Sequence, residues 1–221
     1  MHHSQGTQAA IGVGWRLLHA ALPVRARVAY QLGLPLSEGV CEAPGCNCQE
    51  TLSHAFMDCS KVGGAVDWLL GLFERLTGRR PPRDPRVVLV DDHRVWEPGG
   101  GEEDQDLWQR LRLIFLYNAW KARSSRSRYQ APRGGDLVAA IIGGATADII
   151  ASIRRDWART RMDAAREEAG GQPCNFSGRD PSMSMDGFKA LWARRGVFCR
   201  VHGSGSAIRL VFNNPSGWLS G

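Results

Sequence analysis

The sequence predicts a mainly α-helical protein with a compact cysteine-rich knuckle near its beginning and a short β-hairpin near its end. Three observations support this fold class. Apolar residues recur at steps of three and four over most of the chain, cysteine and histidine gather between residues 41 and 59, and two short β-like runs occur after residue 196. With 221 residues and 43% hydrophobic content, the chain can bury the core of one domain or of two small ones.

Two short helices are expected before the cysteines. Trp15, Leu18 and Leu22 stand at helical steps before Pro23, and residues 24–32 continue with a second apolar repeat. These two helices would flank the cysteine cluster and present it.

The cluster is the densest chemical feature of the chain. Five thiol or imidazole side chains lie within nineteen residues, more than core packing requires: Cys41, Cys46, Cys48, His54 and Cys59. Structural zinc takes four soft or borderline ligands at the corners of a tetrahedron, and a Cys₃His set supplies them without an open coordination position. The cluster therefore predicts one Zn²⁺ that folds the protein and does not catalyse.

The spacing predicts how this site is built. Residues 43–45, Ala-Pro-Gly, favour a turn that brings the next cysteine back beside Cys41. Thr51 is an acceptable N-cap for a short helix that carries His54, and Cys59 would close the site near the end of that helix.

The fourth ligand is either Cys46 or Cys48. The Pro-Gly turn delivers Cys46 directly, which favours it and leaves Cys48 as a neighbour. The competing interpretation is a set of unrelated buried cysteines around a hydrogen-bonded histidine. A disulfide framework fits less well, because the chain is not short and Cys174 and Cys199 stand far from the cluster.

The beginning of the chain lacks the features of a secretion signal, and no apolar run approaches the ~20 residues that span a bilayer. We therefore expect no membrane partner and a reducing intracellular location, in the nucleus or the cytoplasm.

Residues 66–76 carry an apolar stripe that predicts the next helix, and Gly78 offers its C-terminal stop. A stiff basic connector over residues 79–83 follows. The apolar run Val87–Val90 predicts a short strand, and the glycine- and glutamate-rich residues after it predict an exposed loop.

A helical hairpin is expected next. Apolar residues repeat at helical steps from 106 to about 128 and from 136 to about 169, and Gly143-Gly144 would allow the two helices to approach closely or kink the second one. Residues 197–201 and 208–212 then predict two strands. The resulting organisation is a zinc-knuckle region with flanking helices over 1–97, a helical hairpin over 106–169, and an irregular tail with a β-hairpin over 170–221.

Charge favours an anionic partner. The chain has 28 basic against 22 acidic residues, a net charge of +6 and a pI near 9.3, and RNA or DNA is the commonest partner of such a protein. Ten side chains are candidate phosphate contacts: Arg16, Arg25, Arg27, Arg79, Arg80, Arg83, Lys121, Arg123, Arg126 and Arg128. The last four also suit a helix C-terminus, where cations complement the dipole.

Signals for an enzyme are thin. Asp91-Asp92 superficially matches the paired aspartates of a two-metal polymerase site, but the preceding ~90 residues are occupied by helices and the knuckle, so a polar turn is the simpler interpretation. Gly203-Ser204-Gly205 lacks the context of a phosphate loop or a nucleophile elbow. His93 and His202 are isolated. We expect no enzyme activity and rank a zinc or two-metal hydrolase last.

Several motifs together resemble a known family. Residues 15–19 (WRLLH), residues 22–28 (LPVRARV), the cysteine pair, and residues 50–56 (ETLSHAF) with Cys59 occur in this order. In that order they resemble the zinc-binding region that follows the polymerase in reverse transcriptases of non-LTR (LINE-type) retrotransposons, especially open reading frames of algal type. The likeness covers roughly Trp15 to Arg159.

The resemblance implies a retroelement-derived zinc-binding module without the polymerase domain, which would bind RNA or DNA non-specifically as an accessory to reverse transcription. By its distance from His54 in the sequence, Cys46 matches the position of the family's second cysteine better than Cys48 does. The gap between Cys41 and Cys46 is wider than the family's usual spacing. The alternative is a zinc-stabilised protein-interaction scaffold that does not bind nucleic acid.

Overall fold

The computed structural model describes residues 8–129, 136–170, 183–203, 208–215 and 218. Its helices and strands follow one another as α1 (Gln8–Leu18), α2 (Arg25–Gln31), η1 (Leu36–Gly39), η2 (His54–Asp58), α3 (Gly63–Thr77), η3 (Arg86–Val90), α4 (Glu102–Tyr129), α5 (Leu137–Glu168), α6 (Met185–Trp192), η4 (Arg194–Gly196), β1 (Cys199–His202) and β2 (Arg209–Phe212). The segments η1 and η4 are 3₁₀-helices, whereas η2 and η3 are π-helices. The predicted fold class is confirmed: the described chain is mainly helical, with a Cys/His cluster before the long helices and an antiparallel β-hairpin near the end.

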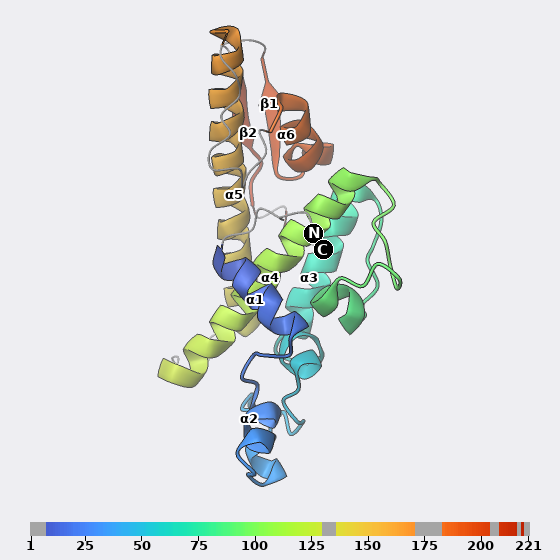
Figure 1. The fold of residues 1–221 in the computed structure, drawn as a ribbon, viewed down its shortest axis with the longest axis vertical. Helices are drawn as coiled ribbons and strands as arrows, with labels where there is room; N and C mark the ends of the chain where they lie inside the picture. The colour runs from blue at the N-terminus through green and yellow to red at the C-terminus, as the bar shows by residue number, and fades with distance from the viewer. Residues whose placement is uncertain (1–7, 130–135, 171–182, 204–207, 216–217, 219–221) are drawn as a thin grey trace.

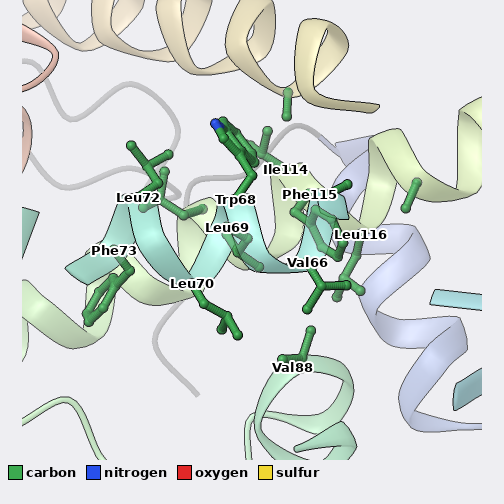
Figure 2. Close-up of a cluster of buried hydrophobic side chains, with 14 of the residues drawn as sticks. Val66, Trp68, Leu69, Leu70, Leu72, Phe73, Val88, Ile114, Phe115 and Leu116 are labelled. Atoms are coloured by element: carbon green, nitrogen blue, oxygen red, sulfur yellow. The ribbon is translucent and has the colours of Figure 1, made fainter. Parts of the chain in front are cut away.

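The centre of the molecule is formed by α3 and α4. Helix α3 is apolar on almost every side, so it is buried between other elements. Figure 2 shows Val66, Leu69 and Phe73 of α3 in a cluster with Phe115 of α4 and Val88 of η3. Helix α3 ends at Thr77, and Gly78 is its C-cap as predicted, in the left-handed conformation with φ of 84°.

Helix α5 runs back along α4, so the predicted helical hairpin is present (Figure 1). The close approach expected at the glycine pair involves Gly144 alone. A Cβ atom at this position would lie 2.3 Å from the side-chain oxygen of Asn118 on α4, whereas Gly143 has nothing within 4 Å. Asn118 donates to the Ile114 carbonyl at 2.9 Å and to Asp148 of α5 at 2.7 Å.

The C-terminal elements pack against the upper half of α5 (Figure 1). Strands β1 and β2 pair antiparallel, with Cys199 opposite Phe212. The Arg154 guanidinium of α5 lies 5.5 Å from the Phe212 ring centre, and Phe198 packs edge-to-face against Trp218 at 4.8 Å. The hairpin is therefore held by the helices, as a lone two-stranded hairpin requires.

A buried ion pair joins three of the helices. Asp156 of α5 is 1% exposed and accepts hydrogen bonds from Arg110 of α4 at 3.1 Å and from the Trp192 indole of α6 at 2.9 Å. One continuous apolar core includes residues from all three ranges into which the sequence divides, from Val13 to Trp218. The ranges 1–97, 106–169 and 170–221 therefore contribute to a common core.

The first helix exposes a different face from the one its apolar repeat indicated. Val13 and Leu17 of α1 are buried against α4, while Trp15 is 59% exposed and Leu18 53% exposed. Helix α1 also begins earlier than predicted and ends at Leu18. Periodicity identified the helix, but both faces carry apolar residues and the pattern could not decide between them.

The run Val87–Val90 is not a strand. It forms η3, a π-helix whose Val87, Val88 and Leu89 are buried. No strand pairs with it within the described part of the chain, and a helical turn satisfies its own backbone hydrogen bonds. Arg112 of α4 donates to the Leu89 carbonyl at 3.2 Å, so α4 stabilises this end of the turn.

One helix of the described residues, α5, is long and apolar enough to cross a membrane by length and composition, with a mean hydropathy of 1.6 in its most apolar window and a third of that window buried. In the structure this helix packs against α4, α3 and α6. Three features of the sequence lie outside the described residues. They are the predicted break at residues 132–135, Cys174, and most of the hairpin loop, including Ser204.

Candidate metal centre

The first half of the site is a small backbone loop. Val40 and Gln49 form an antiparallel bridge, and the Cys41 N–H donates to the Cys48 carbonyl at 2.9 Å. The Cys46 N–H donates to the Ala43 carbonyl at 2.9 Å, which closes the expected turn over Pro44 and Gly45. Gly45 has φ of 78°, a value that this turn requires after the proline and that glycine adopts without a steric cost. The turn places the Cys46 sulfur beside that of Cys41.

The second half of the site is η2. The Thr51 hydroxyl accepts a hydrogen bond from the His54 N–H at 3.1 Å, which is the N-cap role predicted for it. The Cys59 N–H donates to the His54 carbonyl at 3.0 Å, a bond that spans five residues and gives the helix its π character. π-helical turns are rare and occur frequently at functional sites. Here the wide turn lets two ligands five residues apart face the same point.

The four predicted ligand atoms converge. The ligand atoms of Cys41, Cys46, His54 and Cys59 all lie within 4.8 Å of one another. The Cys46 sulfur is 3.3 Å from His54 Nε2, and the Cys41 and Cys59 sulfurs are 4.0 Å apart.

These separations can be compared with a tetrahedral zinc site. Zn–S bonds of about 2.3 Å and Zn–N bonds of about 2.0 Å at tetrahedral angles place two sulfurs about 3.8 Å apart, and a sulfur and a nitrogen about 3.5 Å apart. The Cys41–Cys59 sulfur separation of 4.0 Å and the separation of 3.3 Å between the Cys46 sulfur and His54 Nε2 each differ from these values by only a few tenths of an ångström. The four side chains thus lie close enough to hold one metal ion, with His54 and Cys59 buried and the other two half-buried.

The pKa values of the Cys46 and Cys41 thiols are shifted in opposite directions. The Cys48 backbone N–H donates to the Cys46 sulfur and lowers the pKa of that thiol, because the bond stabilises the thiolate. Burial raises the pKa of Cys41 to about 12, and a hydrogen bond from the Ala43 N–H at 3.4 Å opposes this rise. A bound dication inverts this logic, since coordination deprotonates a thiol outright.

Cys48 lies outside the group of four and is exposed. Its thiol donates a hydrogen bond to the Cys46 sulfur, and this bond raises the pKa of Cys48. Of the two cysteines that the sequence left as alternatives, the structure brings Cys46 together with the other ligands and leaves Cys48 beside it.

Glu50 ties the knuckle to the rest of the protein. Its side chain is 4% exposed, accepts from the Arg25 backbone N–H at 2.7 Å and pairs with Arg123 of α4. Phe56 of η2 stacks on Trp120 of α4 with ring centres 6.2 Å apart, and the Arg123 guanidinium lies 5.5 Å from the Trp120 ring centre. Glu50 therefore joins the loop of residues 41–49 to the start of α2 and the end of α4. No local signal in the sequence indicates this role of Glu50.

Four of the ten predicted phosphate contacts form ion pairs inside the chain. Arg25 pairs with Glu42, and Arg80 with Glu74. Arg83 pairs with Asp67 at 2.9 Å and also donates to the Met57 carbonyl of η2. The fourth is Arg123, held by the buried Glu50.

The other six differ in their surroundings. Arg16, Arg27 and Arg79 form no ion pair within the part of the chain that the structure describes. Lys121 lies 5.9 Å from the Tyr117 ring centre. The side chains of Arg126 and Arg128 lie outside the described residues.

The paired aspartates have structural contacts. Asp91 accepts from the Trp108 indole at 3.0 Å and lies 3.7 Å from Arg112, and its φ of 62° ends η3. A hydrogen bond from the Arg94 side chain lowers the pKa of Asp92. Asp91 thus secures η3 to α4, which is more than the simple polar turn that the sequence predicted.

No protein-family model, curated protein or solved structure matches the chain. The likeness to retrotransposon zinc-binding regions therefore stays a prediction that depends on the motifs. What supports a function is the chemistry of the residues themselves, above all the convergent Cys₃His group.

Proposed function

We propose that this chain is a zinc-binding module, derived from a retroelement, that binds RNA or DNA non-specifically through phosphate contacts. The observation that carries the proposal is the convergence of three sulfurs and one imidazole nitrogen within 4.8 Å. Thiolates select soft or borderline cations, and four protein ligands leave no position for a substrate or an activated water. The zinc is therefore structural, and it orders the lobe that contains α2 (Figure 1).

Metal content tests the zinc part of this proposal. Native mass spectrometry of the purified chain should show one zinc ion, which is lost on chelation. Cys46→Ser should abolish stoichiometric binding, whereas Cys48→Ser, a matched change two residues away at an exposed thiol, should retain it. Equal zinc loss in both variants would contradict the assignment of Cys46, and full zinc retention in Cys46→Ser would contradict the Cys₃His site itself.

Charge supports the nucleic-acid part. The net charge of +6 and pI near 9.3 favour a polyanionic partner. Arg16, Arg27 and Arg79 have no carboxylate partner among the described residues, so their charges are free to contact phosphates. Phosphate contacts release counterions, which makes the affinity fall linearly with salt on logarithmic axes.

Fluorescence anisotropy with a labelled single-stranded RNA and a DNA duplex tests this part. We expect an affinity that is independent of the nucleic-acid sequence and that decreases steeply from about 50 to about 200 mM salt. Over this range, a protein that makes several phosphate contacts loses orders of magnitude in affinity. An affinity that does not change over this range would refute nucleic-acid binding by phosphate contacts. Zinc content measured on the same sample separates this failure from an unfolded knuckle.

One observation favours the second candidate, a zinc-stabilised protein-interaction scaffold. Four large apolar side chains are exposed within seven residues beside the knuckle, with Tyr30 at 87% and Leu36 at 81%, together with Leu32 and Leu34. Clustered exposed apolar residues commonly mark interaction sites. Binding to a protein with an affinity that is insensitive to salt would support the scaffold in place of nucleic-acid binding.

A further inference from the structure

The C-terminal elements form an open hollow on the surface that the sequence did not indicate. It has a volume of about 550 Å³ and is widely open to solvent, and residues of α6, η4 and β1 line it. Figure 1 shows where α6 and β1 lie in the fold. Its lining consists of Lys189, Ala193, Arg195, Gly196, Arg200, Val201 and His202. A space of this size is larger than a phosphate group and can receive a nucleotide.

The lining is cationic. Lys189, Arg195 and Arg200 contribute three positive charges, His202 adds an imidazole, and none of the seven lining residues is acidic. Lys189 makes an ion pair of 3.7 Å with Asp186, but the Asp186 side chain is 96% exposed, so solvent screens this pair. Arg200 and His202 form no ion pair within the part of the chain that the structure describes.

The hairpin positions two of these groups. Arg200 and His202 are two residues apart on β1, so their side chains project from the same face of the strand. Both are exposed, whereas Cys199 on the other face is buried in the core. Arg209 on β2 is paired with His202 and is also exposed, which adds a cation at the edge of this face.

The turn before β1 supports the same surface. Arg195 has φ of 49°, a left-handed conformation that is rare for a residue with a side chain, and Gly196 follows with φ of 64°. Arg195 donates to the Thr77 carbonyl at the end of α3 at 3.3 Å, which holds the turn against the body of the protein. A Cβ at Gly196 would lie 3.1 Å from Arg200 Nε, so Arg200 lies directly over the turn.

We infer that this hollow binds phosphate groups, and that Lys189 and Arg200 are the main contacts. Phosphate oxygens accept hydrogen bonds only, and the hollow offers cationic donors without a competing carboxylate in its lining. This inference rests on the proposed function where the phosphates belong to an RNA or DNA strand. A free nucleotide presents the same chemistry and is the second source that the experiment distinguishes.

The hollow is distinct from the metal centre. Its lining comes from residues 189–202, whereas the metal centre is formed by residues 41–59. It would give a bound strand a second contact surface, in addition to the arginines predicted in the first 130 residues. Arg195 is left unchanged in the test, because its contact with Thr77 gives it a structural role.

The test uses the zinc-loaded full chain with Lys189→Gln/Arg200→Gln. The matched control is Arg86→Gln/Arg94→Gln, which also removes two positive charges. Arg86 lies on η3 and Arg94 in the loop after it, and both are exposed arginines that pair with nearby aspartates. Binding to a single-stranded RNA is measured from 50 to 200 mM salt, and the backbone amides of residues 189–202 are followed by NMR during titration with a nucleoside monophosphate.

If the hollow binds a strand, the Lys189→Gln/Arg200→Gln variant should lose about tenfold or more in affinity. The slope of log affinity against log salt should become shallower by about 1.4, since each phosphate contact on a single strand contributes about 0.7. The control should keep the wild-type slope. If the source is a free nucleotide, the monophosphate should shift the amides of residues 189–202 in the wild type and not in the variant, with strand binding unchanged.

The inference is overturned if the variant and the control bind RNA alike and the monophosphate shifts no amide around the hollow. Failure of the proposed function has a different signature. In that case the wild-type chain binds neither RNA nor DNA, and the monophosphate titration still reports on the hollow by itself.

Discussion

Replacement of Glu50 by glutamine should destabilise the protein although it removes no atom from the metal centre. The Glu50 carboxylate is buried, accepts from the Arg25 N–H at 2.7 Å and accepts from Arg123 Nε at 3.1 Å. A glutamine amide has one oxygen and one NH₂ group, so it cannot accept at both positions. One donor, at the first turn of α2 or on the Arg123 side chain, would therefore lose its partner.

The magnitude follows from the burial of the two groups. Hydrogen bonds to charged groups contribute about 1.5–3 kcal/mol each, and breaking a buried ion pair costs about 3–5 kcal/mol. The Arg123 side chain is 20% exposed, so water compensates part of its loss. We expect Glu50→Gln to lower the free energy of unfolding by about 3 kcal/mol.

Arg123→Gln should give a similar loss, and the double variant should lose much less than the sum. The control is Arg80→Gln. Its pair with Glu74 at 3.0 Å has both side chains almost half exposed, and such pairs contribute about 0–1 kcal/mol. The assay is urea unfolding of the zinc-loaded chain, followed by circular dichroism and tryptophan fluorescence, because Trp120 lies beside Arg123.

Equal, small effects of Glu50→Gln and Arg80→Gln on unfolding would contradict a stabilising role of the Glu50–Arg123 ion pair. The same variants decide what Arg123 does, since the sequence predicted it as a phosphate contact. If Arg123→Gln leaves stability unchanged and makes the salt dependence of RNA binding shallower, Arg123 contacts phosphate and its pair with Glu50 is of little energetic importance.

Three further outcomes are expected. Gly144→Ala should destabilise by about 1–3 kcal/mol in urea unfolding, because its Cβ would lie 2.3 Å from the hydrogen-bonded Asn118 side chain, whereas Gly143→Ala, with open space around it, should be neutral or stabilise by up to about 1 kcal/mol. Burial raises the pKa of the Cys199 thiol from 9.0 to about 12. Above pH 9 the thiol therefore ionises in the unfolded chain before it ionises in the folded one, and the free energy of unfolding falls. In urea unfolding, the wild type should lose about 1.4 kcal/mol more than Cys199→Ala between pH 8 and pH 10. Cys59→Ser should lose zinc and show a low-temperature melting step of the knuckle lobe by circular dichroism, and an unchanged melting curve with full zinc content would contradict its role as a ligand.

The parts of the fold that could be predicted from the sequence are those with local causes. The helical period of α3, α4 and α5 is repeated over many residues, so their existence and approximate bounds were predictable. The turn at residues 43–46 and the Thr51 cap depend on residues a few positions apart, and both occur as predicted. The convergence of the ligands follows from these two local structures.

What could not be predicted depends on residues distant in the chain. Val87–Val90 is β-like in composition, but it has no neighbouring strand in the described chain, and it forms a helical turn that packs against α1 and accepts hydrogen bonds from Arg112 of α4. The exposed position of Trp15 depends on how α1 lies on α4, which a pattern with apolar residues on both faces cannot determine. Charge alone likewise could not separate the arginines that are free from those held by carboxylates far away in sequence.

The predicted phosphate contacts and the cationic hollow show why charge in the sequence does not identify free cations. The ten predicted phosphate contacts are basic side chains grouped along the chain. Four of them pair with carboxylates in the folded protein, and Arg123 pairs with one that is 73 residues away. The cationic hollow instead combines Lys189 of α6 and Arg195 of η4 with Arg200 and His202 of β1. A better criterion for phosphate binding in this protein is a set of cations that folding brings together with no carboxylate in the lining. The hollow meets that criterion, because Asp186, the partner of Lys189, is 96% exposed and lies outside the lining.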